Sequence, residues 1–388
     1  MSRALARLLV DTLRLSPPAE RAGLVDRWAG PDVAANADAI AAWSAFEQVE
    51  QWLLRRLLDH GALAGAPAKL VTALQSATRR DVKAGMAVDA DTADVLRLLA
   101  AHGVPCVLLK GPARRASVAS LVLADARLTR DVDVLVPAGE AERVWRQLRA
   151  RGYSPYKYDP GAVPPGETEV QGPSPYHLRT LVREGGSAVE LHVTTERGLP
   201  PEQAWARLWS SARVVSWQGL DVHVPSGTEL LWQALTHADV TRPPGWTLRY
   251  WLDAVSVLAA QPVDWATVIA RVQPLPPGER TPALRWLSIG IRLAGTAQPA
   301  GVAPPVPFAL ERLLAWRLDV LATARRPRWR QKLLDEATRM EAGLDFAPPV
   351  TGRSWPIQVR RRCVELAARG AYRAWRFGQL GGGGRSQS

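Results

Sequence analysis

Residues 131–136, Asp-Val-Asp-Val-Leu-Val, form an apolar run that carries two carboxylates one residue apart. A short run rich in β-branched residues predicts a strand. Side chains alternate between the two faces of a strand, so Asp131, Asp133 and Leu135 point one way and the three valines point the other. Neighbouring carboxylates repel each other, and burying them unpaired is costly. We therefore expect a cation between these acids, and Mg²⁺ is a hard cation that binds carboxylate and phosphate oxygens together.

A third acid lies in a second strand-like run, residues 188–193. In this run Glu190 and His192 share one face, and the apolar residues Val189, Leu191 and Val193 share the other. If the run pairs beside the 131–136 strand, Glu190 completes a cluster of three carboxylates. Such a cluster holds two metal ions, or one ion and a base, for in-line nucleotidyl or phosphoryl transfer.

Upstream of the acids, the chain reads Leu109-Lys110-Gly111-Pro112. The apolar run 104–109 predicts a buried strand, and the proline predicts a helix that starts here and continues to about residue 123. A glycine turn at a helix N-terminus is a ready anion site, and Lys110 adds positive charge to it. Acids for a metal and a turn for phosphates are the two halves of a nucleoside triphosphate site.

The surrounding pattern is mostly helical. Residues 1–88 have apolar residues at helical spacing, and Asp91-Thr92 predicts the N-cap of a further helix that ends at Gly103. Residues 140–151 predict another helix, closed by Gly152, and the pattern is helical again from Pro200 to about residue 375. Residues 177–182 and 188–193 predict a hairpin.

The fold class expected from this order is α+β, a small mixed sheet with large helical flanks. Residues 154–175, rich in Pro and Gly, predict a long loop next to the core. We expect four regions along the chain: a helical region 1–88, an α/β core 89–200, a helical domain 201–300, and a basic helical region 301–388 with a disordered tail.

Composition limits the class of protein further. The net charge is +12, and residues 311–388 hold 16 basic and 7 acidic residues. This basic region suits nucleic acid or an acidic partner, or is simply a solvated helical face. No apolar run has the roughly 18–20 residues of a membrane span, so no membrane association is expected. The two cysteines, Cys106 and Cys363, suggest no disulfide framework, and we expect a cytoplasmic protein.

Several motifs together resemble a known family. Leu108-Leu109-Lys110-Gly111, then Arg127-x-x-x-Asp131-x-Asp133, then Val189-Glu190-Leu191-His192 are similar to the motifs of an uncharacterised bacterial nucleotidyltransferase family within the DNA polymerase β-like superfamily. Residues 235–238 and 246–253 resemble the helical continuation of that family. The resemblance covers about residues 90–260.

The resemblance implies roles for five residues. Asp131 and Asp133 would be metal ligands that orient the triphosphate, and Glu190 would be a third ligand that orients or deprotonates the acceptor hydroxyl. Lys110 and Gly111 would hold the β- and γ-phosphates. The superfamily turn is usually Gly-Ser, whereas this chain has Lys-Gly, so the phosphate contact is inferred less directly. Val193 stands where the family has Trp, a change that affects packing rather than chemistry.

Other residues have more than one interpretation. Arg127 either binds phosphate or balances the charge of the aspartates. His192 either orients a carboxylate, touches the acceptor, or is a structural histidine, and Arg249 would have to reach the substrate to play a part. His237 and Asp253 are interpreted as packing or capping partners between the core and the helical domain.

The sequence therefore predicts a Mg²⁺-dependent enzyme that moves an NMP from an NTP to an acceptor hydroxyl, with a two-metal site. The acceptor is left open between a small molecule, a peptide or protein, and RNA. The alternatives are a phosphotransferase that uses the same site, and an inactive nucleotide-binding regulator or scaffold.

Overall fold

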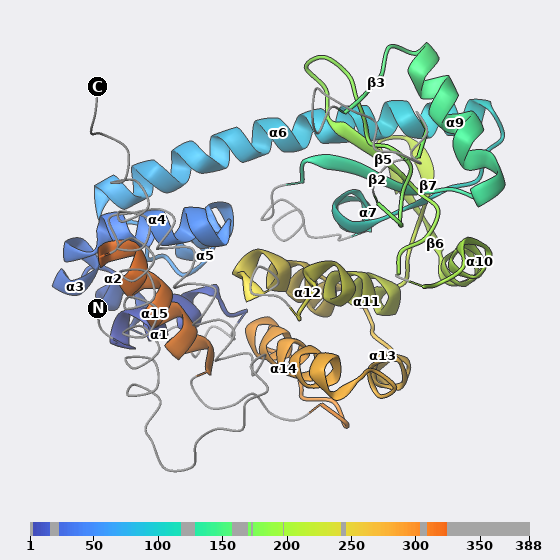
Figure 1. The fold of residues 1–388 in the computed structure, drawn as a ribbon. Helices are drawn as coiled ribbons and strands as arrows, with labels where there is room; N and C mark the ends of the chain where they lie inside the picture. The colour runs from blue at the N-terminus through green and yellow to red at the C-terminus, as the bar shows by residue number, and fades with distance from the viewer. Residues whose placement is uncertain are drawn as a thin grey trace, which may run out of the picture.

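The computed structural model describes residues 3–15, 23–117, 129–156, 170–171, 174–196, 198–241, 246–302 and 309–323. Helices dominate, and the strands, which form a five-stranded and a two-stranded sheet, lie together on one side of the molecule (Figure 1). In chain order the elements are α1 (Arg3–Leu13), α2 (Leu24–Trp28), α3 (Pro31–Ala35), α4 (Ala37–Glu47), α5 (Glu50–Asp59), α6 (Ala68–Ala101), β1 (Val107–Leu108), α7 (Lys110–Ser117), β2 (Asp131–Leu135), α9 (Ala138–Ala150), β3 (Ser154–Pro155), β4 (Leu181–Val182), β5 (Ala188–His192), α10 (Pro201–Ser211), β6 (Arg213–Trp217), β7 (Leu220–Val224), α11 (Gly227–Ala238), α12 (Leu248–Ala260), α13 (Trp265–Val272), α14 (Pro277–Ala294) and α15 (Ala309–Thr323).

The main sheet has the strand order β1-β2-β5-β4-β3. Its central pair, β2 and β5, is parallel, and the other pairs are antiparallel. The predicted α+β class with a mixed sheet is confirmed, as is the hairpin formed by β4 and β5. The predicted pairing of the Glu190 strand beside the Asp133 strand is confirmed too, so both acids lie at the centre of the sheet.

The two faces of the sheet differ in polarity. Val132, Val134 and Leu191 are fully or almost fully buried in the main core, to which α9 contributes Val144 and Leu148. On the other face, Leu135 packs against Leu208 of α10 in a separate apolar cluster. The acids lie on this second face, beyond that cluster. One face therefore anchors the sheet, and the other presents carboxylates.

One long helix, α6, replaces the separate helix expected after residue 91. The predicted N-cap at Asp91-Thr92 is wrong, because the Thr92 hydroxyl donates to the Val88 carbonyl inside the helix at 2.7 Å. The Asp91 carboxylate instead accepts from Arg183 at 2.5 Å and from the Ser187 amide at 2.6 Å. In Figure 1, α6 runs from the N-terminal helices to the sheet, crossing residue 88 without interruption.

The predicted helical pattern after Pro200 is interrupted by a two-stranded sheet, β6 and β7. This part of the prediction is wrong. The two strands pair in antiparallel fashion and are joined by Gln218 and Gly219, whose φ angles are 50° and 74°. Two successive residues with positive φ build the tight turn that matches the twist of a hairpin. The helical pattern resumes in α11, as expected.

The helical segments before and after the sheet contact each other and the helices next to the sheet. Helices α11, α12 and α14 pack on one another next to α7, and α15 returns to contact α1 and α4 of the N-terminal region (Figure 1). The predicted domain boundaries stay predictions. Most of the 154–175 loop, the predicted end of the helix after residue 117, and the chain beyond 323 lie outside the described residues.

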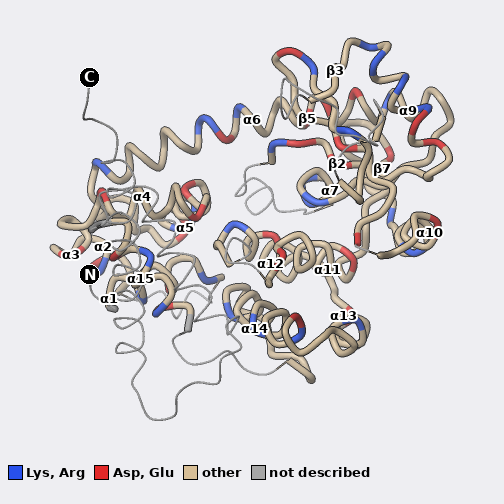
Figure 2. The backbone as a smooth tube through the Cα atoms, viewed as in Figure 1, with Lys and Arg blue, Asp and Glu red and all other residues tan. Residues whose placement is uncertain are grey.

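Charged residues of both signs are interspersed over the described elements, as along α6 and α9 (Figure 2). Most of the predicted basic region lies outside the described residues, so its role stays a prediction. In the described part of the chain, no helix combines the length and the apolarity that crossing a membrane requires.

A buried ion pair joins the two ends of the described chain. Glu47, fully buried at the end of α4, accepts from Arg317 of α15 at 2.7 Å and from the Leu248 amide of α12 at 2.8 Å. Burial raises the pKa of Glu47, although Arg317 and the Leu248 amide oppose that shift. The carboxylate therefore links three segments, and removing it leaves the Arg317 charge buried.

We expect Glu47→Ala to lower the free energy of unfolding by about 3–5 kcal/mol, because the buried guanidinium of Arg317 loses its carboxylate partner. The double variant Glu47→Gln/Arg317→Met, which retains an acceptor for Leu248, should recover most of the loss. Denaturant unfolding measures both. The exposed pair of Glu140 and Arg143 provides a control, since Glu140→Ala should cost less than about 1 kcal/mol. Equal losses at the two sites would contradict the role of burial.

Gly111 is required by packing. It lies in the first turn of α7, where helical backbone suits any residue, but an added Cβ would lie 2.5 Å from Thr129 Cγ2. The sequence prediction assigns this glycine to close approach of a phosphate. The structure gives a second reason, because the buried Thr129 fills the space next to it.

Gly111→Ala should therefore destabilise the protein by about 1–3 kcal/mol through overpacking. Thr129→Ala in the same chain should restore part of the stability, because the Cγ2 and Oγ1 atoms that clash are removed. Gly139→Ala is the matched control, since Gly139 is also the second residue of a helix and a Cβ there meets nothing within 4 Å. Thermal melts of the three variants and the wild type test this, and a loss at Gly139 equal to that at Gly111 would contradict it.

Candidate active site

Two carboxylates meet at the centre of the sheet. The parallel register of β2 and β5 places Asp133 directly opposite Glu190. Side chains of directly paired residues on one face are close neighbours. Asp133 is almost fully buried, with 1% of its side chain exposed, whereas Glu190 is 16% exposed and faces a cavity. The strand pairing thus builds the acidic pair that the sequence predicts.

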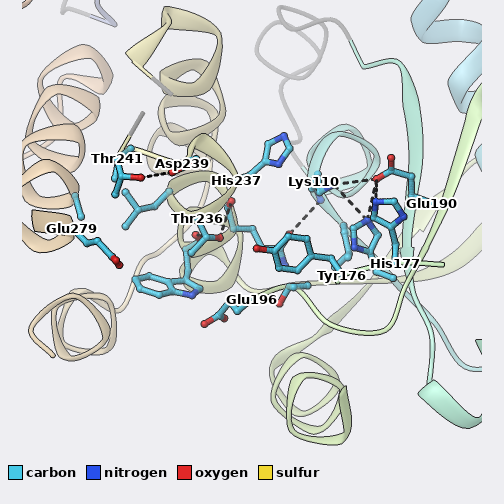
Figure 3. A pocket seen from close by; sticks show the side chains of 18 of the residues that line it. Lys110, Tyr176, His177, Glu190, Glu196, Thr236, His237, Asp239, Thr241 and Glu279 are labelled. Carbon is cyan, nitrogen blue, oxygen red and sulfur yellow. Dashed lines mark hydrogen bonds and ion pairs between the residues drawn. The ribbon is translucent and has the colours of Figure 1, made fainter. Parts of the chain in front are cut away.

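The ammonium group of Lys110 lies between these acids, and Figure 3 shows its interaction with Glu190. Its Nζ is 2.6 Å from Asp133 Oδ1 and 3.5 Å from Glu190 Oε2. Lys110 has a φ of 44°, a left-handed conformation that is uncommon outside glycine. Its backbone amide donates to Gln233 Oε1 of α11 at 3.3 Å. The first residue of α7 therefore points a positive charge into the acidic pair.

The charges of this cluster support one another. Burial opposes the charge on Lys110, but the attraction of Asp133 and Glu190 prevails and raises its pKa. Burial likewise opposes the charge on Asp133, yet Lys110 and His192 hold the pKa of that carboxyl well below its usual range. The pKa of Glu190 is also lowered, since hydrogen bonding to His192 and attraction to Lys110 and His177 together outweigh burial and repulsion by Asp133. Both acids are ionised at neutral pH.

His192 is positioned by the last residue pair of the same two strands. It is buried, and its Nε2 lies 2.9 Å from Asp133 Oδ1 and 3.4 Å from Glu190 Oε2. An ionised carboxylate only accepts hydrogen bonds, so Nε2 carries a proton and donates to Asp133. Burial and Lys110 disfavour charge on the ring, but hydrogen bonds to the two acids raise its pKa. This geometry favours the carboxylate-orienting reading of His192.

His177 joins the cluster without having been predicted. Its Nδ1 lies 2.7 Å from the Leu178 carbonyl, which can only accept, so Nδ1 carries the proton. Burial lowers the pKa of His177, and the ring is neutral at pH 7. Its Nε2 therefore presents a lone pair 3.6 Å from Glu190 Oε2. Two lone pairs at this distance favour a proton or cation between them.

Asp133, Glu190 and His192 each place a possible ligand atom within 4.8 Å of the other two, and the two carboxylates are the ligands that remain while His192 Nε2 donates its proton to Asp133. Among the described residues, the buried Oδ2 of Asp133 has no hydrogen-bond partner, so one ligand position of this carboxylate is available to a cation. Carboxylates suit Mg²⁺ and Mn²⁺, so the residues fit a divalent cation. Asp131, half-buried, lies outside this group of three but lines the same cavity.

The cavity has a volume of about 680 Å³ and lies between the sheet and helices α11 and α14. Gln233 of α11 lines it and holds the Lys110 amide, a role that was not predicted. A signal was present, since Gln233 is the one amide in the apolar run 230–235 of a buried helix. His177, next to a Pro- and Gly-rich segment, had no comparable signal.

The remaining predicted residues lie at different places. Arg249 donates to Gln48 Oε1 at 3.0 Å and is absent from the cavity lining given by the described residues. Arg127 lies outside the described residues. Asp253 pairs with Arg114 of α7 at 2.9 Å, which confirms its reading as a packing partner between the core and the helical domain. His237 packs edge-on against Tyr250 and also lines the cavity.

Comparisons with known proteins agree with this site. The model of a family described as an uncharacterised nucleotidyltransferase matches residues 34–279, more than half of the chain. The matched range includes the sheet, the acidic pair, and helices α11 and α12, and it extends beyond the predicted 90–260 on both sides. A comparison with curated proteins finds no match. The chain therefore belongs to the uncharacterised nucleotidyltransferase family.

Proposed function

We propose that the protein transfers an NMP from an NTP to a hydroxyl of an acceptor, in a reaction that depends on Mg²⁺. The observation that carries the proposal is the β2–β5 register, which sets Asp133 beside Glu190, with Lys110 between them. Family membership supports the same class of reaction. The cysteine content supports a reducing cytoplasm as the compartment, and the basic region beyond residue 311 remains a candidate for nucleic-acid contact.

Asp131, Asp133 and Glu190 would hold the cation, and the same three carboxylates would also be the ligands of a second ion. When bound, the cation supplies neutralisation of triphosphate charge and lowers the pKa of the acceptor hydroxyl. His192 acts through Asp133, because its Nε2 proton fixes the orientation of that carboxylate. A held carboxylate costs less reorganisation during the reaction.

Lys110 serves two states of the site. Without a cation, its ammonium neutralises Asp133 and Glu190. With a cation held by the acids, the same ammonium, which lines the cavity, would be available to the β- and γ-phosphates. The left-handed φ of Lys110 holds the side chain where both partners are in reach. Backbone strain of this kind concentrates at functional sites.

His177 is the group best placed to accept the proton of the acceptor hydroxyl. Its Nε2 lone pair faces Glu190 at the cavity wall, and the Leu178 carbonyl fixes its tautomer. The lowered pKa of Glu190 keeps this carboxylate ionised, and an ionised carboxylate suits the orientation of a hydroxyl. We therefore assign to Glu190 the orientation of the hydroxyl, and to His177 the removal of its proton.

The first test separates nucleotidyl from phosphoryl transfer. Protein with Mg²⁺ is incubated with α-labelled or γ-labelled NTP and with small-molecule, peptide and RNA fractions of a cell extract. We expect the α-label to appear in a product and the γ-label in pyrophosphate. Asp133→Asn and Glu190→Gln should lower the rate by about 10²–10⁴-fold, and His177→Gln by about 10²-fold.

Other outcomes of this test have distinct meanings. Transfer of the γ-label to an acceptor would replace the proposal with a phosphotransferase. Binding of NTP by calorimetry without transfer of either label to any fraction would favour a nucleotide-binding regulator or scaffold. Glu202→Gln, an exposed carboxylate in the first turn of α10, is the control and should leave the rate unchanged.

The second test asks whether Lys110 and a divalent cation compete for the carboxylates of Asp133 and Glu190. Lys110→Met should strengthen Mn²⁺ binding by about tenfold, because the competing ammonium is gone. The metal-free variant should melt at a lower temperature, since Asp133 is left buried without its cation, and Mn²⁺ should restore the melting temperature.

Mn²⁺ binding is followed by electron paramagnetic resonance and melting by calorimetry, so neither readout needs activity. Lys69→Met is the matched control, because Lys69 pairs with Asp38 at an exposed site and should change neither quantity. Weaker Mn²⁺ binding in Lys110→Met would contradict the idea that lysine and metal compete for the same carboxylates.

A further inference from the structure

The first turn of α7 offers few backbone donors to a phosphate. Pro112 has no N–H group, and the Ala113 amide already donates to a backbone carbonyl at 3.1 Å. The Lys110 amide is also in use, because it donates to Gln233 Oε1 at 3.3 Å. Of the first four residues of this helix, Gly111 alone keeps an amide that the described residues leave to a ligand. An anion bound at this turn therefore needs donors from other elements.

Gln233 of α11 carries such a donor. Only the oxygen of its side-chain amide can accept from the Lys110 N–H group, so this contact fixes Oε1 toward α7 and turns Nε2 away from it. Gln233 is 5% exposed and lines the cavity. Among the described residues, its buried Nε2 has no hydrogen-bond partner. Buried donors in native proteins are normally paired, so this NH₂ group indicates a ligand that brings an acceptor atom.

The position of Gln233 favours an anionic acceptor. Among the described residues that line the cavity, Lys110 is the single Lys or Arg, and its ammonium is available to the β- and γ-phosphates in the proposed reaction. Gln233 contacts the backbone of that same lysine, so its Nε2 belongs to the phosphate end of the cavity. The Lys110 N–H group also polarises the side-chain amide, which makes Nε2 a stronger donor.

Helix α11 holds Gln233 in place. Ser226 caps the helix by accepting from the Glu229 amide at 3.3 Å, and the buried Glu229 carboxylate pairs with Arg271 of α13 at 2.5 Å. The Thr236 hydroxyl donates to the Gln233 carbonyl at 3.3 Å. A donor that is fixed before the ligand arrives loses less conformational freedom on binding. The helical region after the sheet therefore supplies a positioned donor to the cavity.

We propose that Gln233 binds the triphosphate, with Nε2 donating to an oxygen of the β- or γ-phosphate while Oε1 holds the amide of Lys110. Gln233 would then be a substrate-binding residue, and it would connect α11 to the phosphate end of the cavity. This inference rests on the proposed function, which places the triphosphate beside Lys110. The alternative is a structural glutamine that only holds the Lys110 amide, and this role requires Oε1 but not Nε2.

Two substitutions separate these roles. Gln233→Met removes the acceptor and the donor together, whereas Gln233→Glu keeps an oxygen for the Lys110 amide and replaces the donor with a second acceptor. Calorimetry measures the binding of ATP and of inorganic tripolyphosphate, each with Mg²⁺. We expect both variants to bind both ligands about tenfold to hundredfold more weakly, because a hydrogen bond to a charged phosphate is lost. A similar loss for tripolyphosphate, which has no base or sugar, assigns the contact to the phosphates.

Gln261→Met is the matched control. Gln261 contacts the other end of α7, where its Nε2 donates to Ser117 Oγ at 3.0 Å, and it is not among the described residues that line the cavity. This variant removes a glutamine that bridges to the same helix, so it should keep the wild-type affinity for both ligands. Thermal melts of the three variants show that each one folds.

Unchanged affinity in Gln233→Met would overturn the inference, since water would then satisfy Nε2. Wild-type affinity in Gln233→Glu would overturn it as well, because the glutamine would then only hold the Lys110 amide. An equal loss in Gln261→Met, or no binding of tripolyphosphate by the wild type, would also contradict it. Failure of the proposed function looks different, since ATP and tripolyphosphate would still bind through Gln233 while no acceptor fraction acquires the α-label.

Discussion

The parallel pairing of β2 with β5 is the constraint on which the site depends. It brings two carboxylates into direct apposition in a sheet whose opposite face is core. Such a pair is stable only if a positive charge lies close by. In this structure the charge is the ammonium of Lys110, 2.6 Å from Asp133, and the proton of His192 adds a second donor. The acids, the lysine and the histidine therefore form one electrostatic unit rather than four independent residues.

This electrostatic unit explains the backbone conformation at the start of α7. Lys110 takes a left-handed backbone conformation, and the next residue is a glycine because Thr129 leaves no space for a Cβ. Two ion pairs hold α7 itself, Arg114 with Asp253 of α12 and Arg115 with Asp89 of α6. The lysine thus projects from a helix that is fixed on both sides, and its reach is limited to the acids and the adjoining cavity.

Sequence patterns predicted the parts of the site that follow from strand periodicity. The alternation in 131–136 and 188–193 put Asp133, Glu190 and His192 on one face, and a single assumption about pairing brought them together. Two kinds of feature escaped prediction. His177 reaches the cluster through an isolated bridge between its residue and His192, a long-range contact that leaves no local periodicity. The N-cap predicted at Asp91 is wrong, because this residue lies inside α6 and its carboxylate makes a tertiary contact with Ser187. The local sequence around an aspartate does not distinguish a cap from such a contact.

That tertiary contact also shows how the helical flank determines the chemistry. Asp91 of α6 binds the side chain of Arg183 and the amide of Ser187, so it holds both ends of the turn between β4 and β5. A shift of one residue in strand register would move every side chain of β5 to the other face of the sheet. Glu190 would then point into the apolar core, and the acidic pair would be lost. The 34-residue helix α6 is therefore more than a connection from the N-terminal helices, because its carboxylate helps to fix the register that keeps Glu190 opposite Asp133.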